Sequence, residues 1–420
     1  MKKETIAISY GYKKDTNRTM NVPIYQTTAY EYESIESAAR LFNLEEEGNI
    51  YTRIGNPTTE IFERRIAKLE GGISALALAS GMASIFYSVM NLVKSGDNVI
   101  ASTKLYGGTI TLLTQTLKPF GIEVRYFDVH KAEELENLID NNTKAIIFES
   151  VANPALSVPD FETITKIADE KEVITICDNT IATPYGCEPI KLGVDIVVHS
   201  ASKYIVGNGS AIAGVIIESK KAKNKLKNID YFSKPDESYH GIIYLDKFEA
   251  PFIARARLAL LRDFGAVISP FNSWLLIQGL ETLSLRIKQH SKSAKKIAKF
   301  LSKYYKVNYP FLKDNENYKY AKKYLKYAGG IISFEVSSFD EAKNIVKNLK
   351  LFNLVTNIGD SKSIVTHPAS TTHQQLSKEE LQKAGVPEGL IRLSIGLENH
   401  KDLIKDLKQA IKKAKIENRD

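Results

Sequence analysis

From about residue 61, short apolar runs alternate with amphipathic ones, and this alternation limits the fold more than any other feature. Five runs are β-branched and nearly continuous in hydrophobic side chains: residues 97–102, 122–129, 143–150, 173–180 and 194–200. Strands buried on both faces have this pattern. Helix-like stretches with periodic apolar positions lie between them, at 80–96, 107–121, 130–142 and 161–172. The alternation predicts an α/β fold with a mostly parallel central sheet.

The two ends of the chain have a different organisation. Residues 1–60 are irregular apart from one helix-like stretch and predict an arm. Residues 269–305 predict one or two long amphipathic helices that lead to a smaller α+β domain. Its expected strands and helices are 329–338, 339–350, 363–369, 391–398 and a last helix from His400. We therefore expect an arm at 1–60, an α/β domain at 61–270 and a C-terminal domain at 271–420.

The charge of the chain invites a nucleic-acid or membrane-surface interpretation. Its 420 residues carry a net charge of +8, and the excess lies in the second half, with 37 basic and 22 acidic residues against 20 and 27 in the first. The lysines are dispersed over expected helices, with no recognised binding module and few interleaved exposed aromatic residues, so we expect solvated faces and no nucleic-acid partner. No apolar run suggests a leader or a membrane span, and two cysteines without a zinc or redox spacing favour the cytoplasm and no metal.

Two strand ends carry side chains that suit pyridoxal-phosphate chemistry. Asp178 ends one expected strand, and Lys203 follows the next strand, where an open α/β sheet places its ligands. A buried lysine is more easily neutral and can form a Schiff base with a carbonyl. An aspartate can keep a pyridine nitrogen protonated. A solvated surface lysine is the competing interpretation.

Other residues could complete such a site. Ser80-Gly81-Met82 opens a helix-like stretch and could bind a phosphate, although a plain helix cap is the locally favoured alternative. Tyr106 could stack on a planar cofactor or merely pack. Tyr51 and Arg53 lie in a segment without a core pattern and could reach a phosphate. Arg392, on an expected strand, could bind a substrate carboxylate or form an internal ion pair.

The assembled motifs resemble the Cys/Met-metabolism family of pyridoxal-phosphate enzymes, fold type I, from about residue 20 to 410. The motifs, in chain order, are YTRIGNPT, ALASGMAS, LYGGT, ESVANP, CDNTIATP and DIVVHSASKYIVGNGSAIAGV. The resemblance implies that Lys203 carries the cofactor, Tyr106 stacks on it and assists proton transfer, and Asp178 holds its ring nitrogen. It assigns the remaining cofactor contacts to Tyr51 and Arg53 of a neighbouring subunit and to Ser80, Gly81, Met82, Asn153, Ser200 and Ser202.

Within the family, the chain is most similar to the O-acetylhomoserine sulfhydrylases. Residues 239–286 resemble their longer insertion, and residues 357–377 resemble their C-terminal signature. Asn357 stands where many cystathionine enzymes have serine, and with Arg392 it is the implied substrate contact. Two departures are Asn208, where histidine is more frequent, and Ser202, where threonine is usual.

The resemblance implies a γ-replacement in methionine and cysteine biosynthesis. O-acetyl-L-homoserine and sulfide or a thiol would give L-homocysteine or a thioether, with acetate as the second product. Methionine γ-lyase and cystathionine γ-synthase activity on the same fold remain alternatives, and a basic surface-binding protein is a remote one. A site shared between subunits implies a homodimer, and the family suggests a homotetramer.

Overall fold

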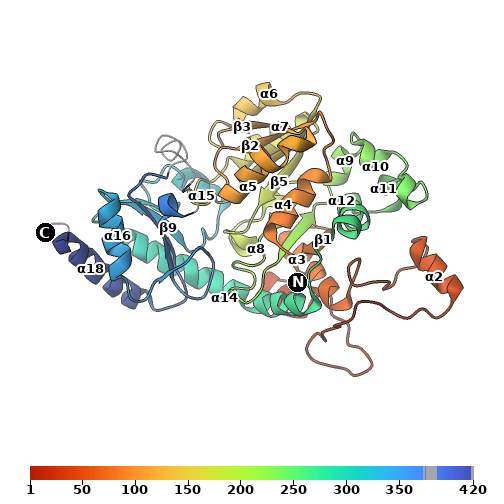
Figure 1. The fold of residues 1–420 in the computed structure, drawn as a ribbon, viewed down its shortest axis with the longest axis horizontal. Coiled ribbons are helices and arrows are strands. Elements are labelled where there is room, and N and C mark those ends of the chain that lie inside the picture. Colours follow the sequence, from red (N-terminus) through yellow and green to blue (C-terminus); the bar gives the residue numbers. More distant parts are fainter. Residues whose placement is uncertain (372–373, 375–385, 418–420) are drawn as a thin grey trace.

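A seven-stranded sheet forms the centre of the computed structural model, which describes residues 1–371, 374 and 386–417 (Figure 1). The strand order is β1-β7-β6-β5-β4-β2-β3. The strands are β1 (Ser74–Leu78), β2 (Asn98–Ser102), β3 (Glu123–Phe127), β4 (Thr143–Glu149), β5 (Ile174–Asp178), β6 (Ile196–His199) and β7 (Gly214–Glu218). Strands β2 to β6 pair in parallel, whereas β7 runs antiparallel to both β6 and β1. The mostly parallel sheet predicted from the sequence is confirmed.

Helices cover both faces of this sheet, because alternate strand residues point to opposite sides. In β4, Ile146 and Phe148 join one core and Ala145 and Ile147 join the other. The first core includes α3 (Pro57–Glu70) and α7 (Phe161–Glu170), and the second includes α4 (Gly81–Met90) and α12 (Pro251–Arg255). Both faces of the sheet are therefore buried. A ligand site can form only where the strands end.

Two expected helices are shorter than the sequence pattern predicts. Residues 107–121 form α5 (Gly107–Thr111), a π-helical turn and a 3-10 turn, since Pro119 lacks the N–H that a continuing helix needs. Residues 130–142 contain only a 3-10 turn and α6 (Leu135–Leu138). The edge strand β1 and its neighbour β7 were not among the expected strands. The alanine-rich β1 has little of the β-branched character that identifies a strand.

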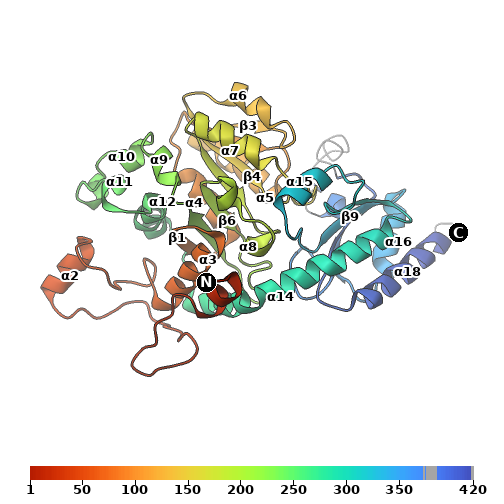
Figure 2. The same ribbon diagram turned by 180° about the vertical axis from the view of Figure 1, so that it is seen from behind.

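A smaller five-stranded sheet follows, with the order β10-β11-β12-β9-β8. Its strands are β8 (Lys306–Asn308), β9 (Ile331–Glu335), β10 (Asn353–Leu354), β11 (Ile364–Thr366) and β12 (Leu390–Ser394). The long amphipathic stretch forms one helix, α14 (Pro270–Leu301), which runs beneath both sheets (Figure 2). Helices α16 (Phe339–Asn348) and α18 (His400–Glu417) pack on the smaller sheet. The predicted strands and helices at 329–350, 363–369 and 391 onward are present.

The first 60 residues divide into two parts. Helix α1 (Lys3–Ser9) packs against α3 and α14, with Ile6 and Ala7 buried in the first core. Helix α2 (Ile35–Phe42) projects away from both sheets (Figure 1). The proposed arm therefore has an anchored beginning and a projecting remainder. None of the described helices combines the length and the apolar character needed to cross a membrane.

Candidate active site

A cavity of about 260 Å³ lies at the carboxyl ends of β4, β5 and β6, between the two sheets. This is the edge at which open α/β sheets bind ligands. Eleven of the thirteen predicted site residues line it: Ser80, Gly81, Met82, Tyr106, Asn153, Asp178, Ser200, Ser202, Lys203, Asn357 and Arg392. The fold thus brings together residues that are up to 312 positions apart in the chain.

Lys203 lies in the turn that follows β6, and its amine points across the cavity to the smaller sheet. Nζ donates a hydrogen bond to Oδ1 of Asn357 at 2.7 Å. Burial lowers the pKa of Lys203, and the nearby charge of Arg392 lowers it further. A lysine in this environment loses its proton more easily than a surface lysine, so it can act as a nucleophile or a base.

Asp178 ends β5 on the floor of the cavity. Its Oδ1 accepts a hydrogen bond from the amide of Thr180 at 2.8 Å. Burial raises the pKa of Asp178, because a carboxylate is less well solvated there than in water. A cation in the cavity would offset that cost, and a protonated pyridine nitrogen is such a cation.

The first turn of α4 provides a place for a phosphate. A Cβ on Gly81 would lie 2.6 Å from Cβ of Ser200, so only glycine lets the helix approach the end of β6 this closely. The first amides of a helix have no acceptor within it and favour an anion. Ser80 does cap α4, since its Oγ accepts from the amide of Ala83 at 3.1 Å. Oγ of Ser202 is already paired, donating to the carbonyl of Ala213 at 3.0 Å.

Arg392 is 4% exposed and is held by neutral acceptors. Its guanidinium donates to Oδ1 of Asn153 at 3.0 Å, to Oγ1 of Thr366 at 3.3 Å and to the carbonyl of Asn357 at 3.4 Å. Burial lowers its pKa to about 10, so it remains charged at neutral pH. Within the described residues it has no acidic ion-pair partner, which makes it available to a carboxylate ligand.

Glu149, at the end of β4, is a lining residue that the sequence reasoning missed. Its Oε1 accepts from the amide of Tyr106 at 2.5 Å, and its Oε2 accepts from the amide of Asn153 at 3.0 Å. Burial and the charge of Asp178 raise the pKa of Glu149 well above its usual range. Glu149 thereby fixes the two loops that carry Tyr106 and Asn153. The available signal was its place at the end of a buried strand, as the first residue of the ESVANP motif.

Three residues of interest lie away from the cavity. Tyr51 and Arg53 are exposed, and the guanidinium carbon of Arg53 lies 5.3 Å from the ring centroid of Tyr51. They are not among the residues that line the cavity of their own chain. Asn208 is exposed, and its Oδ1 accepts from Oγ of Ser210 at 2.6 Å. The C-terminal signature at 357–377 lies partly outside the described residues.

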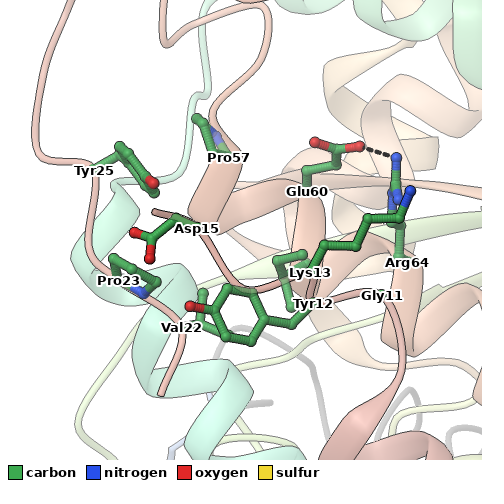
Figure 3. A pocket seen from close by; sticks show the side chains of 11 residues that line it. Gly11, Tyr12, Lys13, Asp15, Val22, Pro23, Tyr25, Pro57, Glu60 and Arg64 are labelled. Carbon is green, nitrogen blue, oxygen red and sulfur yellow. Dashed lines mark ion pairs between the residues drawn. The ribbon is translucent and has the colours of Figure 1, made fainter. Parts of the chain in front are cut away.

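A second cavity, of about 190 Å³, lies between residues 11–25 and the first turns of α3 (Figure 3). Glu60 and Arg64, which are among its lining residues, form an ion pair. None of the predicted site residues lines it. Among the described residues, no group of three or more His, Cys, Asp or Glu side chains could hold a metal ion.

The chain is similar to characterised sequences over nearly all of its length. A family model for Cys/Met metabolism PLP-dependent enzymes matches residues 4–412. The chain is 45% identical to an O-acetyl-L-homoserine sulfhydrylase of Leptospira meyeri, with 98% of this chain and 97% of that protein covered. It is 40% identical to an L-methionine gamma-lyase of Fusobacterium nucleatum subsp. polymorphum, with 97% and 98% covered.

A solved structure from Campylobacter jejuni, provisionally assigned as an O-acetylhomoserine (thiol)-lyase, has the same fold. The TM-score is 0.95 at 51% sequence identity, with 98% of this chain and 100% of that chain covered. That structure contains N'-pyridoxyl-lysine-5'-monophosphate.

Proposed function

Because the chain belongs to the Cys/Met metabolism family of PLP-dependent enzymes, we propose that it catalyses a γ-replacement on O-acetyl-L-homoserine. The second substrate is sulfide or a small thiol. With sulfide, acetate leaves from Cγ and sulfur takes its place, giving L-homocysteine and acetate. The observation that carries this proposal is the convergence of Lys203, Asp178 and Arg392 on one cavity.

The cofactor and the fold type follow from the family. The chain is a pyridoxal-phosphate enzyme of fold type I, as the sequence motifs predicted. Bound pyridoxal phosphate supplies an electron-poor ring that stores the electron pair released when the Cα–H bond of the substrate breaks. The residues present fit this group, because the cavity has an acid for the ring nitrogen and a glycine-lined helix N-terminus for the phosphate.

Eight of the lining residues have a proposed task. Lys203 bonds to the cofactor through Nζ and later moves protons at Cα and Cβ of the substrate, for which its lowered pKa suits it. Asp178 keeps the ring nitrogen protonated. Arg392 binds the substrate carboxylate through its planar fork of donors, and Asn357 orients the lysine amine. Tyr106 stacks on the ring and assists proton transfer, while Gly81, Met82 and Ser200 bind the phosphate.

A second activity has specific support. The methionine gamma-lyase relative has nearly the same coverage and a slightly lower identity, 40% against 45%, so γ-elimination on this fold is the nearest competing reaction. Both reactions need the same lysine and arginine. In γ-replacement an external sulfur nucleophile completes the reaction, whereas in γ-elimination water completes it. Analysis of the products distinguishes the two reactions.

The proposed assembly is a homodimer whose sites are shared, as part of a tetramer. Tyr51 and Arg53 support it, because they are exposed on the projecting part of the arm and do not line their own cavity. The proposed location is the cytoplasm, in keeping with two buried free thiols, Cys177 and Cys187.

The test is a substrate panel on the purified holoenzyme. Acetyl-, succinyl- and phosphohomoserine, cystathionine and methionine are each supplied with and without sulfide, and homocysteine, acetate and 2-oxobutanoate are measured. We expect homocysteine and acetate in equal amounts from O-acetylhomoserine, only with sulfide. The proposal would be contradicted if 2-oxobutanoate were released from methionine faster than homocysteine forms from O-acetylhomoserine. It would also be contradicted if succinylhomoserine were preferred to O-acetylhomoserine.

A further inference from the structure

Lys203 lies in a helical turn. The last carbonyl groups of this turn need hydrogen-bond donors from elsewhere in the protein. The amide of Lys203 donates to the carbonyl of Ser200 at 3.2 Å, and the amide of Gly207 donates to the carbonyl of Lys203 at 2.8 Å. The carbonyls of Tyr204 and Ile205, just after the lysine, point towards α14. Terminal carbonyls of a helical turn are unsatisfied unless water or a side chain donates to them.

Arg286 of α14 supplies the donors. Its Nη1 donates to the carbonyl of Tyr204 at 2.5 Å, and its Nη2 donates to the carbonyl of Ile205 at 3.0 Å and to that of Gly279 at 2.5 Å. Nε donates to Oγ1 of Thr282 at 3.1 Å. Burial lowers the pKa of Arg286 to about 10, so the guanidinium is still charged at neutral pH. No ion pair to an acidic side chain accompanies these bonds within the described part of the chain.

Two glycines make room for this contact. Gly207 has a φ of +76°, and a Cβ there would lie 2.1 Å from Nη1 of Arg286. A Cβ on Gly279 would lie 2.2 Å from the carbonyl oxygen of Ile205. Any larger residue at either position would push the turn away from α14. The turn, the helix and the guanidinium therefore fit together only at this close distance.

The side chain next to the lysine is held as well. The hydroxyl of Tyr204 accepts from the amide of Gly330 at 2.8 Å, and its ring meets the edge of His290, with centroids 5.2 Å apart. His290 lies one turn beyond Arg286 on the same face of α14. Both the backbone and the side chain that follow Lys203 are thus fixed by elements far from it in sequence.

We propose that Arg286 is a positioning residue that sets where Nζ of Lys203 lies. The proposal rests on the role of Lys203 given above. Arg286 does not line the cavity, so it acts through the carbonyls of Tyr204 and Ile205 and not on a ligand. Loss of these bonds frees the turn, and an ångström-scale displacement of a reacting group costs about 100-fold in rate.

The experiment compares Arg286→Met and Arg286→Lys with Arg255→Met. Arg255 is a matched control, because it is also half-buried and donates to the carbonyl of Asn91, on the far side of the large sheet. The readouts are the rate at which apoprotein captures pyridoxal phosphate, followed by visible absorbance, and kcat and KM of the holoenzyme. We expect Arg286→Met to slow capture and to lower kcat about 10- to 100-fold, with KM changed less than about twofold. Arg286→Lys should recover part of both losses.

The outcomes for these variants decide whether Arg286 has the positioning role. Normal capture and kcat in Arg286→Met, or equal losses in Arg255→Met, would overturn the positioning role. If Arg286→Met does not fold, Arg286→Lys carries the test: it keeps the charge but lacks the planar fork that donates to both carbonyls, so capture should be slower than in the native protein, and native capture and kcat would overturn the positioning role. Lys203→Ala separates the two claims: normal turnover there overturns the proposed function, whereas normal Arg286→Met beside inactive Lys203→Ala overturns only the positioning role.

Discussion

Nη1 of Arg392 donates to Oδ1 of Asn153 at 3.0 Å and so joins β12 of the small sheet to the loop after β4 of the large sheet. The bond orients a buried cation towards the cavity without neutralising it. The site consequently has its proposed carboxylate-binding group, Arg392, on β12 of the small sheet and Lys203 in the turn after β6 of the large sheet. Any change in how the two sheets approach each other alters the distance between these two groups.

Replacing Arg392 with lysine should weaken substrate binding. A lysine keeps the charge but loses the planar fork that binds a carboxylate through two parallel bonds. A hydrogen bond between charged groups contributes about 1.5–3 kcal/mol, so kcat/KM for O-acetylhomoserine should fall roughly 10- to 150-fold, mainly through KM. Steady-state kinetics measure this. Arg125→Lys, on the surface of β3, is the control and should leave KM unchanged. An unchanged KM in Arg392→Lys would remove the carboxylate role.

Asn357 should control the protonation of Lys203. Its Oδ1 accepts from Nζ and stabilises the charged amine, so Asn357→Ala should lower the pKa of Lys203 further below its usual range. Asn357→Asp places a negative charge there and should raise it. The pH dependence of Lys203 labelling by an amine-reactive reagent, measured in apoprotein by peptide mass spectrometry, gives both directions. Shifts of the same sign in the two variants would contradict the contact.

Glu218, which lies away from the active site, should make the stability of the protein depend on pH. Burial raises the pKa of Glu218 to about 8, and its Oε2 accepts from the amide of Ile253 at 2.9 Å. The folded protein keeps a proton that the unfolded chain releases above about 4.5, so stability falls as pH rises from about 4.5 to about 8.

Glu218→Gln cannot ionise, so its Tm should rise relative to the native protein between pH 5 and 8. Differential scanning calorimetry follows the difference, and kcat should stay unchanged. Exposed Glu47→Gln is the control and should track the native protein at every pH. A constant difference between Glu218→Gln and the native protein would show that Glu218 is ionised when folded.

Mixed dimers test the shared site. Arg53→Ala and Lys203→Ala should each be inactive, but a hybrid of the two has one site with both residues intact. Random mixing makes half of the dimers hybrids, so refolding the two variants together should restore about one quarter of native activity. No activity above that of the separate variants would show that each chain supplies its own Arg53.

The sequence predicts the residues that line the cavity better than the residues that hold them in place. Lys203 and Asp178 follow buried strands, and parallel strands bring their carboxyl ends together whatever the packing around them. Arg286 makes its bonds to backbone groups 81 and 82 positions away, and backbone acceptors leave no residue pattern to detect. Glu149 was missed for the same reason, since its partners are the amides of Tyr106 and Asn153.

Tertiary packing explains one expectation that was wrong in part and one strand that was not expected. The stretch 130–142 has a helical pattern but forms a single short helix after a 3-10 turn, since few of its residues reach the core. Strand β1 lacks β-branched residues and is a strand because β7 pairs with it.

The identity of the lysine that holds the cofactor is the central claim, and reductive trapping tests it most directly. Holoenzyme is reduced with borohydride and digested. The peptides are then analysed by mass spectrometry for the added mass of the pyridoxyl-phosphate group. We predict the label on Lys203 alone, at close to one per chain, and none in apoprotein treated alike. A label on another lysine, or no label on a fully active enzyme, would contradict the account.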